Sequence, residues 1–234
     1  METVASLFRV LWAPRETLFR VRKQPRLLIP LLFITFFAVA EAATLMVRVD
    51  SGQLRAEQWQ REGIADKLSQ EDQLTLMTSA RQQQRIALIS ASVRPLLITA
   101  VATLIFFGCF SILGRTAGFK TFFSLTTFSF VPLAIRSLLS IVTLLIVAPS
   151  PRVLELTGGV SPAVFINPQS VSRLTYVGAG LLDLVSFWIL ALLVIAYGFV
   201  ASPKVLTVHR VVVVVGVWLV YAALRLGLAS VANV

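Results

Sequence analysis

Five long apolar stretches constrain this chain more than any other feature. Each is at least as long as the run of about 17–25 mostly apolar residues with which an α-helix crosses a bilayer. Of the 234 residues, 57% are hydrophobic and only 14% are charged. Because a chain in lipid must satisfy its backbone hydrogen bonds internally, the sequence predicts an all-α polytopic membrane protein, a five-span transmembrane helical bundle. The predicted spans are residues 27–46, 86–113, 119–148, 177–201 and 208–231.

Side chains suited to catalysis or metal binding are scarce. Cys109 is the only cysteine and His209 the only histidine, so the sequence offers neither a disulfide, nor a cysteine metal cluster, nor a Cys–His pair. Residues 114–121 resemble a phosphate loop, but Phe119 separates the second glycine from Lys120, and no buried strand is expected before them. We therefore expect no enzymatic activity, no cofactor and no metal site.

The basic residues bear on orientation. The formal net charge is +10, but the positive residues are dispersed along the span flanks, so we expect no nucleic-acid partner. Short positive segments stay on the cytoplasmic side, which favours a cytoplasmic N-terminus and a C-terminus outside, in the cell (inner) membrane if the source is prokaryotic. The basic residues on this side are Arg9, Arg15, Arg20, Arg22, Lys23, Arg26, Arg115, Lys120, Lys204 and Arg210.

Residues 1–26 form a segment of their own ahead of the first span. Apolar residues recur at helical spacing up to Trp12, and Pro14 suits the first turn of a second short helix. We expect an N-terminal amphipathic helix lying in the cytoplasmic interface, where basic side chains meet anionic headgroups. A dedicated partner-binding helix is the alternative. The expected lipid contacts are Phe8, Trp12, Arg15, Arg20, Arg22, Lys23 and Arg26.

A polar segment, residues 49–85, separates the first two spans. It is rich in Gln, Glu and Arg and has few helix breakers. We expect extramembrane helices here, either as a small outer cap or as a helical extension leading into the second span. The segment is too short to hold a soluble catalytic domain.

Each predicted span contributes one charged residue at membrane depth. A charge at membrane depth costs about 2.5–3.5 kcal/mol on insertion scales, so each one needs a partner, water or a function. Helical rise places all five in the outer third of the membrane. They are Glu41, Arg94, Arg136, Asp183 and Arg225.

Two interpretations of these charges remain open. We expect Glu41 to lie near Arg94, and Asp183 to pair with Arg136 or Arg225. The set would then be either a polar cavity that binds an anion, a headgroup or an acidic group, or a group of interhelical ion pairs with snorkelling arginines. Hydroxyl residues crowd the inner half of the third span, where they serve helix packing or line a substrate path.

Several stretches together resemble the Yip family of membrane proteins, named for interaction with Ypt/Rab GTPases, and specifically its prokaryotic branch. They are LFRVLWAPRETLFR (7–20), GFKTFF (118–123) with FVP (130–132), LDLVSFW (182–188) and AYG (196–198). The resemblance implies a five-span Yip-like membrane domain over residues 27–234, with 49–85 as an insertion. Eukaryotic relatives bind GTPases and each other in vesicle traffic. The long N-terminal cytosolic region of those relatives is not found here, which argues against a small GTPase partner.

Two functions from different classes follow. The first is a non-enzymatic scaffold or adaptor that binds membrane lipids or other membrane proteins, with a homo-oligomer left open. The alternative is a transport component that recognises an anionic solute or lipid through the outward-facing charged layer. A transporter needs the charged layer and the hydroxyl residues to join into a water-accessible route, whereas a scaffold can seal both by packing.

Overall fold

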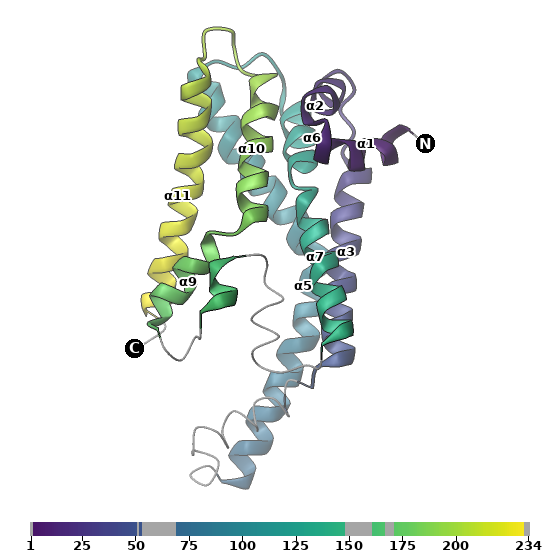
Figure 1. Cartoon of the computed structure of the whole chain (residues 1–234), viewed down its shortest axis with the longest axis vertical. Helices are drawn as coiled ribbons and strands as arrows, with labels where there is room; N and C mark the ends of the chain where they lie inside the picture. The colour runs from purple at the N-terminus through teal and green to yellow at the C-terminus, as the bar shows by residue number, and fades with distance from the viewer. Residues whose placement is uncertain (1, 51, 53–68, 148–160, 167–170, 232–234) are drawn as a thin grey trace.

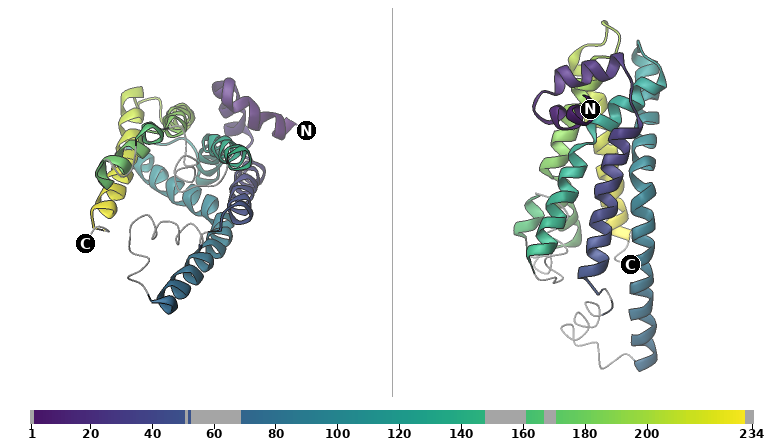
Figure 2. Two further views of the ribbon diagram at one scale, coloured as in Figure 1. Left: turned by 60° about the horizontal axis from the view of Figure 1, so that its bottom comes forward. Right: turned by 90° about the vertical axis from the view of Figure 1, so that its right-hand side faces the viewer.

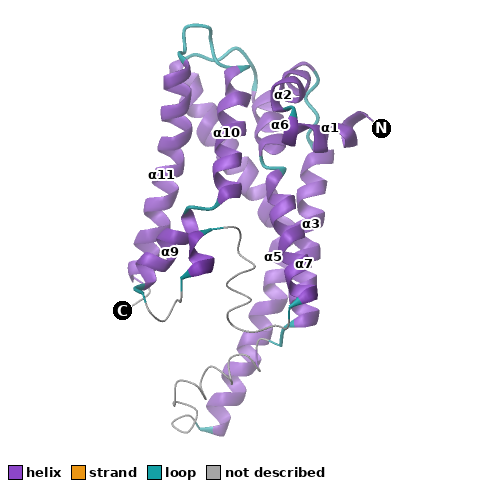
Figure 3. Ribbon diagram, viewed as in Figure 1, coloured by secondary structure: helices purple, strands orange, loops and turns teal. Residues whose placement is uncertain are grey.

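The computed structural model describes residues 2–50, 52, 69–147, 161–166 and 171–231. Within these ranges the chain is helical and contains no strand (Figure 3). The all-helical class predicted from the sequence is confirmed. The elements are α1 (Glu2–Trp12), α2 (Pro14–Lys23), α3 (Leu28–Arg48), α5 (Gln70–Leu113), α6 (Phe119–Ser129), α7 (Pro132–Ile146), η2 (Pro162–Phe165), α9 (Arg173–Leu181), α10 (Leu184–Gly198) and α11 (Thr207–Val231).

Four helical units are long and apolar enough to cross a membrane. They are α3, α5, α6 with α7, and α11, and the pair α9 and α10 passes the same test together. The polytopic bundle is therefore confirmed, with a fifth span if the bent pair crosses as one. The third span stays a single unit over residues 119–146 although Pro132 begins α7, because proline is accommodated in the first turn of a helix.

The fourth span is not the continuous helix that the sequence predicted. It bends by 46° between α9 and α10. Gly178 and Gly180 lie in the last turns of α9, where glycine weakens a helix. Asp183 then adopts an extended backbone (φ −88°, ψ 132°) before α10 begins. The charge that the sequence placed inside a span therefore lies at a helix break.

The helices pack as two groups joined near one end. Helix α3 packs along α5 and α7, while α11 packs against α9 and α10, and α10 contacts α6. Helices α1 and α2 lie at the end of the bundle where α3 begins, together with the α5–α6 and α10–α11 connectors (Figure 1). We call this the α1–α2 end. Helix α5 extends past the other helices at the opposite end (Figure 2).

An aromatic cluster forms the centre of the core near the α1–α2 end. Tyr197 of α10 packs against Phe106 and Phe110 of α5 and Phe122 of α6, with ring centroids 4.9, 5.2 and 5.5 Å away. All four side chains are at most 3% exposed. The Tyr197 hydroxyl lies 2.8 Å from the Thr126 hydroxyl, so its polar end has a partner. Such pairs each stabilise packing by about 0.5–1.5 kcal/mol beyond area burial, so the cluster holds α5, α6 and α10 together.

The first two helices pack on the bundle as a collar. Leu7 and Val10 of α1 and Leu18 and Val21 of α2 are buried in the core cluster. Trp12 is 70% exposed. Pro14 occupies the first turn of α2, as its position in the sequence predicted.

The polar segment that follows α3 lies partly outside the described residues, which resume at Ser69. From Gln70 it is the beginning of α5, which continues unbroken to Leu113, so this part is a helical extension of the second span. The Ser69 hydroxyl caps α5 by accepting the Asp72 amide at 3.1 Å. Asp50 pairs with Arg81 at 2.8 Å and ties the end of α3 to this extension.

The two connectors at the α1–α2 end are hydrogen-bonded to each other. The Ser202 amide donates to the Gly114 carbonyl at 3.0 Å, and the Thr116 amide to the Val200 carbonyl at 2.7 Å. Gly114 has φ +111°, a conformation that residues with a Cβ rarely adopt. A Cβ there would also lie 3.2 Å from that of Ser202. Gly114 thus allows α5 to end where the two connectors meet.

We expect Gly114→Ala to lower the free energy of unfolding by about 1–3 kcal/mol, because the backbone strain adds to the close approach. Gly108→Ala is the matched control, since Gly108 lies in the same helix with nothing within 4 Å of an added Cβ. Thermal unfolding followed by tryptophan fluorescence measures both. Equal midpoints for the two variants would contradict the assigned role of Gly114.

Candidate functional site

A cleft of about 390 Å³ lies between α3, α5 and α7. Its charged lining residues are Glu41 from α3, Arg94 from α5 and Arg136 from α7, and we call it the charged cleft. Ser90 and Ser137 add two hydroxyls to its wall. Three of the five charges predicted within spans are therefore brought to one cleft.

Small residues make the space for these side chains. Ala38 and Ala42 of α3 face Ala87 and Ala91 of α5 across the same cleft. Each pair is spaced by four residues, which places both members on one side of a helix. Their short side chains allow close approach of the two helices and leave room for the longer Glu and Arg chains nearby.

Pro95 lies inside α5 directly after Arg94. A proline removes one backbone hydrogen bond from a helix interior and bends or loosens it there. In the next two turns the threonine hydroxyls find partners within the helix. The Thr99 hydroxyl donates to the Pro95 carbonyl and the Thr103 hydroxyl to the Thr99 carbonyl, both at 2.7 Å. Both threonines are at most 1% exposed, so they pack in the helix interface and do not line the cleft.

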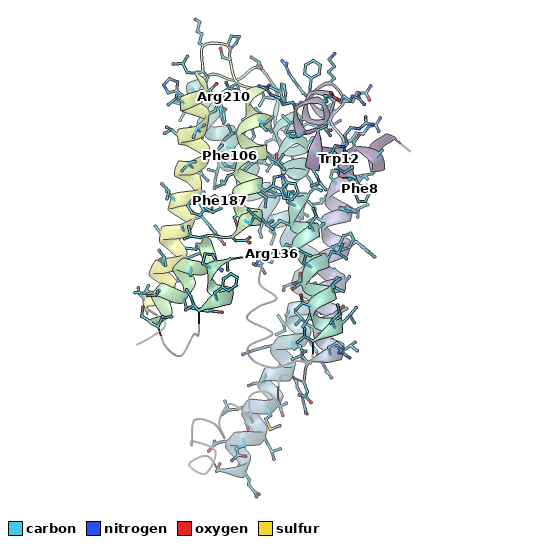
Figure 4. The ribbon with its side chains drawn as sticks, viewed as in Figure 1. Phe8, Trp12, Phe106, Arg136, Phe187 and Arg210 are labelled. Atoms are coloured by element: carbon cyan, nitrogen blue, oxygen red, sulfur yellow. The ribbon has the colours of Figure 1, made fainter. Side chains whose placement is uncertain are left out.

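Arg136 links the charged cleft to the broken fourth span. Its Nη1 lies 3.9 Å from Asp183 Oδ2, and Figure 4 shows the side chain reaching from α7 towards the junction of α9 and α10. The Arg136 side chain is 39% exposed and that of Asp183 only 4%. The separation is that of an ion pair, longer than a well-formed hydrogen bond, and it joins the two helix groups.

Asp183 sits in an environment that makes this pair important. Ser186 donates to Oδ2 at 3.3 Å, while Oδ1 is buried without a hydrogen-bond partner among the described residues. The position before α10 also places the carboxylate near the positive end of that helix dipole. A buried carboxylate costs several kcal/mol unless it is paired, so the guanidinium of Arg136 is the main compensation that this site provides.

The remaining three charges are placed less tightly. Glu41 and Arg94 both line the charged cleft, but no ion pair within 4 Å joins them, nor does Glu41 form one with any other described residue. Arg225 lies outside the charged cleft, with its guanidinium carbon 5.9 Å from the Tyr221 ring of its own helix. Of the five charges predicted within spans, three thus line one cleft, Asp183 pairs with one of them, and Arg225 is separate.

The hydroxyl residues of the third span are bonded locally. Thr126, Thr127 and Ser129 each donate to a carbonyl one turn earlier, at 2.7–2.9 Å. Ser124 instead donates to the Arg26 carbonyl at 2.9 Å and accepts the Arg26 amide at 3.0 Å, which fixes the segment between α2 and α3. These contacts favour helix packing over a substrate path as the role of these hydroxyl residues.

The family model of the Yip1 domain matches residues 8–228. The chain belongs to the Yip1 domain family. This bears out the resemblance noted in the sequence. Neither the curated proteins nor the solved structures compared with the chain contain a match. All five intramembrane charges and every residue expected at the lipid interface fall within the matched range.

Within the Yip1 domain, the charged cleft is suited to recognition. One carboxylate, two guanidinium groups and two hydroxyls can bind an anionic or zwitterionic group, because guanidinium forms paired hydrogen bonds to carboxylate and phosphate. Among the described residues no group of three or more His, Cys, Asp and Glu side chains could hold a metal ion.

Sequence reasoning missed two contacts that position the Yip1 domain's cleft helices. Arg48 donates to the Leu144 and Leu145 carbonyls at 3.2 and 3.3 Å, so it caps the end of α7 from the end of α3. Gln84 of α5 donates to the Leu45 and Val49 carbonyls at 3.2 and 2.8 Å. In the sequence both residues are ordinary polar residues near the end of a span. Their roles depend on which helix ends are neighbours, and the sequence alone does not give that.

We expect Arg136→Gln to destabilise the Yip1 domain by about 1–3 kcal/mol, because it leaves Asp183 buried without a counter-charge. The loss is below the roughly 3–5 kcal/mol of a fully buried pair, since Arg136 is partly exposed. Arg225→Gln is the matched control and should change stability by less than about 0.5 kcal/mol. Thermal unfolding in detergent measures both.

The double variant Arg136→Gln/Asp183→Asn separates the ion pair from a general packing effect. It should unfold at a higher temperature than Arg136→Gln alone, because the uncompensated charge is gone. A further loss on adding Asp183→Asn would contradict the pairing.

Proposed function

We propose that this Yip1-domain protein is a non-enzymatic membrane adaptor that binds another membrane protein or a lipid through the charged cleft. The supporting observation is that the side of the cleft nearer the α1–α2 end is apolar. Ile34, Ile98 and Leu133 line that side, and Thr103 and Phe106, further along α5, are buried. A polar recess with an apolar inner side is suited to holding a group from a partner.

The alternative, a transport component, needs a polar route through the bundle. Inward of the charged cleft, the Thr103, Thr126 and Ser129 hydroxyls donate within their own helices. The aromatic cluster around Tyr197 then fills the space between α5, α6 and α10. These contacts favour the adaptor. The two arginines in the cleft are the observation that still supports the transport hypothesis.

The partner's chemistry follows from the charges. Glu41, Arg94 and Arg136 carry a net charge of +1 in the cleft when all are ionised, and Arg136 is already committed to Asp183. Glu41 and Arg94 are then the pair available to a guest. The adaptor would therefore receive a group with both a positive and a negative end, such as a zwitterionic headgroup or paired side chains of a partner helix.

Orientation completes the proposal. The basic side chains expected on the cytoplasmic side belong to α1, α2, the segment before α3, and the parts of the chain around the α5–α6 and α10–α11 connectors. With that end cytoplasmic, the charged cleft opens towards the outside of the cell membrane. Homo-oligomers remain compatible with this arrangement, because the partner helix can come from a second copy.

The test is photo-crosslinking in native membranes. A photoreactive residue at Ala91, which lines the cleft, should give a discrete adduct, and Glu41→Gln should reduce the adduct at least threefold. The control position is Val101, 54% exposed on the same helix. Adducts of the same yield and pattern at both positions, or no response to Glu41→Gln, would contradict the adaptor.

A further inference from the structure

A second cleft, of about 400 Å³, lies at the α1–α2 end. Four cations line it, and we call it the basic cleft: Arg9 from α1, Arg20 and Lys23 from α2, and Arg26 from the segment before α3. Phe128 of α6 also contributes to its lining. No acidic side chain that the structure describes lines it.

Helix geometry explains why these four converge and two other arginines do not. In α2 the three-residue spacing puts Arg20 and Lys23 on one face, whereas Arg15 and Arg22, seven residues apart, share another face. Neither Arg15 nor Arg22 lines the basic cleft, and Arg22 instead lines a separate recess with Arg210. The basic residues of the N-terminal segment are therefore divided into two groups.

Arg9, Arg20 and Lys23 bring like charges from two helices to one small space. Their mutual repulsion is reduced when an anion with several oxygens sits between them. Arginine guanidinium binds phosphate oxygens in pairs, and lysine adds a point charge. A phosphate group is the anion that best fits three arginines and one lysine.

The apolar surface beside the cleft indicates where the phosphate comes from. On α1, Phe8 and Trp12 are 47% and 70% exposed, and Arg9 follows them around the helix. The Phe8 ring also packs edge-to-face on Phe33 of α3, with ring centroids 5.8 Å apart, and Figure 4 shows Phe8 and Trp12 on α1 near the start of α3. Exposed aromatic residues next to basic ones are typical of helices that lie in the headgroup layer.

We propose that the basic cleft binds the phosphate of one anionic lipid headgroup, with the acyl chains running beside Phe8 and Trp12. Arg9 and Arg20 clamp the phosphate from two helices, while Lys23 and Arg26 supply additional charge. The site is distinct from the charged cleft and holds whether that cleft receives a protein or a lipid. It also differs from general headgroup attraction, which would involve Arg15 and Arg22 equally.

The test uses the full-length protein in nanodiscs of phosphatidylcholine with a minor fraction of phosphatidic acid. Native mass spectrometry measures how much phosphatidic acid stays bound after release from the disc. Arg9→Gln/Arg20→Gln should weaken retention about 30-fold, about fivefold for each cation. Arg15→Gln/Arg22→Gln removes the same charge from the other face and should weaken retention by less than about threefold.

Two further measurements identify the source of the phosphate. Inorganic phosphate at millimolar concentration should displace little phosphatidic acid if the acyl chains contribute, and Trp12→Ala should then weaken retention as well. Full displacement by inorganic phosphate, with no effect of Trp12→Ala, would overturn the lipid assignment. Equal losses in the two double variants, or equal retention of phosphatidylcholine and phosphatidic acid, would overturn the site itself. Circular dichroism confirms that each variant is folded.

Discussion

A polar group in a bilayer core must find its partner within the protein, and the arrangement of this bundle follows from that constraint. Thr99 and Thr103 donate to the preceding turns of their own helix. Tyr197 meets Thr126 inside an aromatic cluster. Asp183, which cannot be satisfied in this way, lies at a helix break and is compensated by Arg136 from the neighbouring group of helices.

Each end carries a different kind of recess. The charged cleft mixes one acid with two bases between three helices, which suits a partner with both charges. The basic cleft collects cations from α1, α2 and the following segment, which suits a phosphate. Between them, the core around Phe110 and Phe122 is fully buried. A packed aromatic core between two recesses is the arrangement on which the proposed adaptor role rests.

The sequence predicts the helices well and their mutual placement poorly. Apolar runs and helical periodicity are local properties, so the spans and the two N-terminal helices follow from them. The break at Asp183 does not, because apolar residues flank it on both sides. The separation of Arg225 from the charged cleft depends on how α11 is rotated against its neighbours. The convergence of Arg9 with Arg20 requires the turn at Ala13, which brings two short helices together.

Water accessibility along α5 and α6 tests the sealed centre most directly. In a Cys109→Ser background, single cysteines replace Ser90 in the charged cleft, Thr103 between that cleft and the α1–α2 end, and Ser129 at the end of α6. Intact cells are labelled with a membrane-impermeant maleimide. The account predicts labelling at position 90 and protection at 103 and 129 until the protein is denatured. Labelling at 103 or 129 in intact cells would show a water-filled route through the bundle and contradict the account.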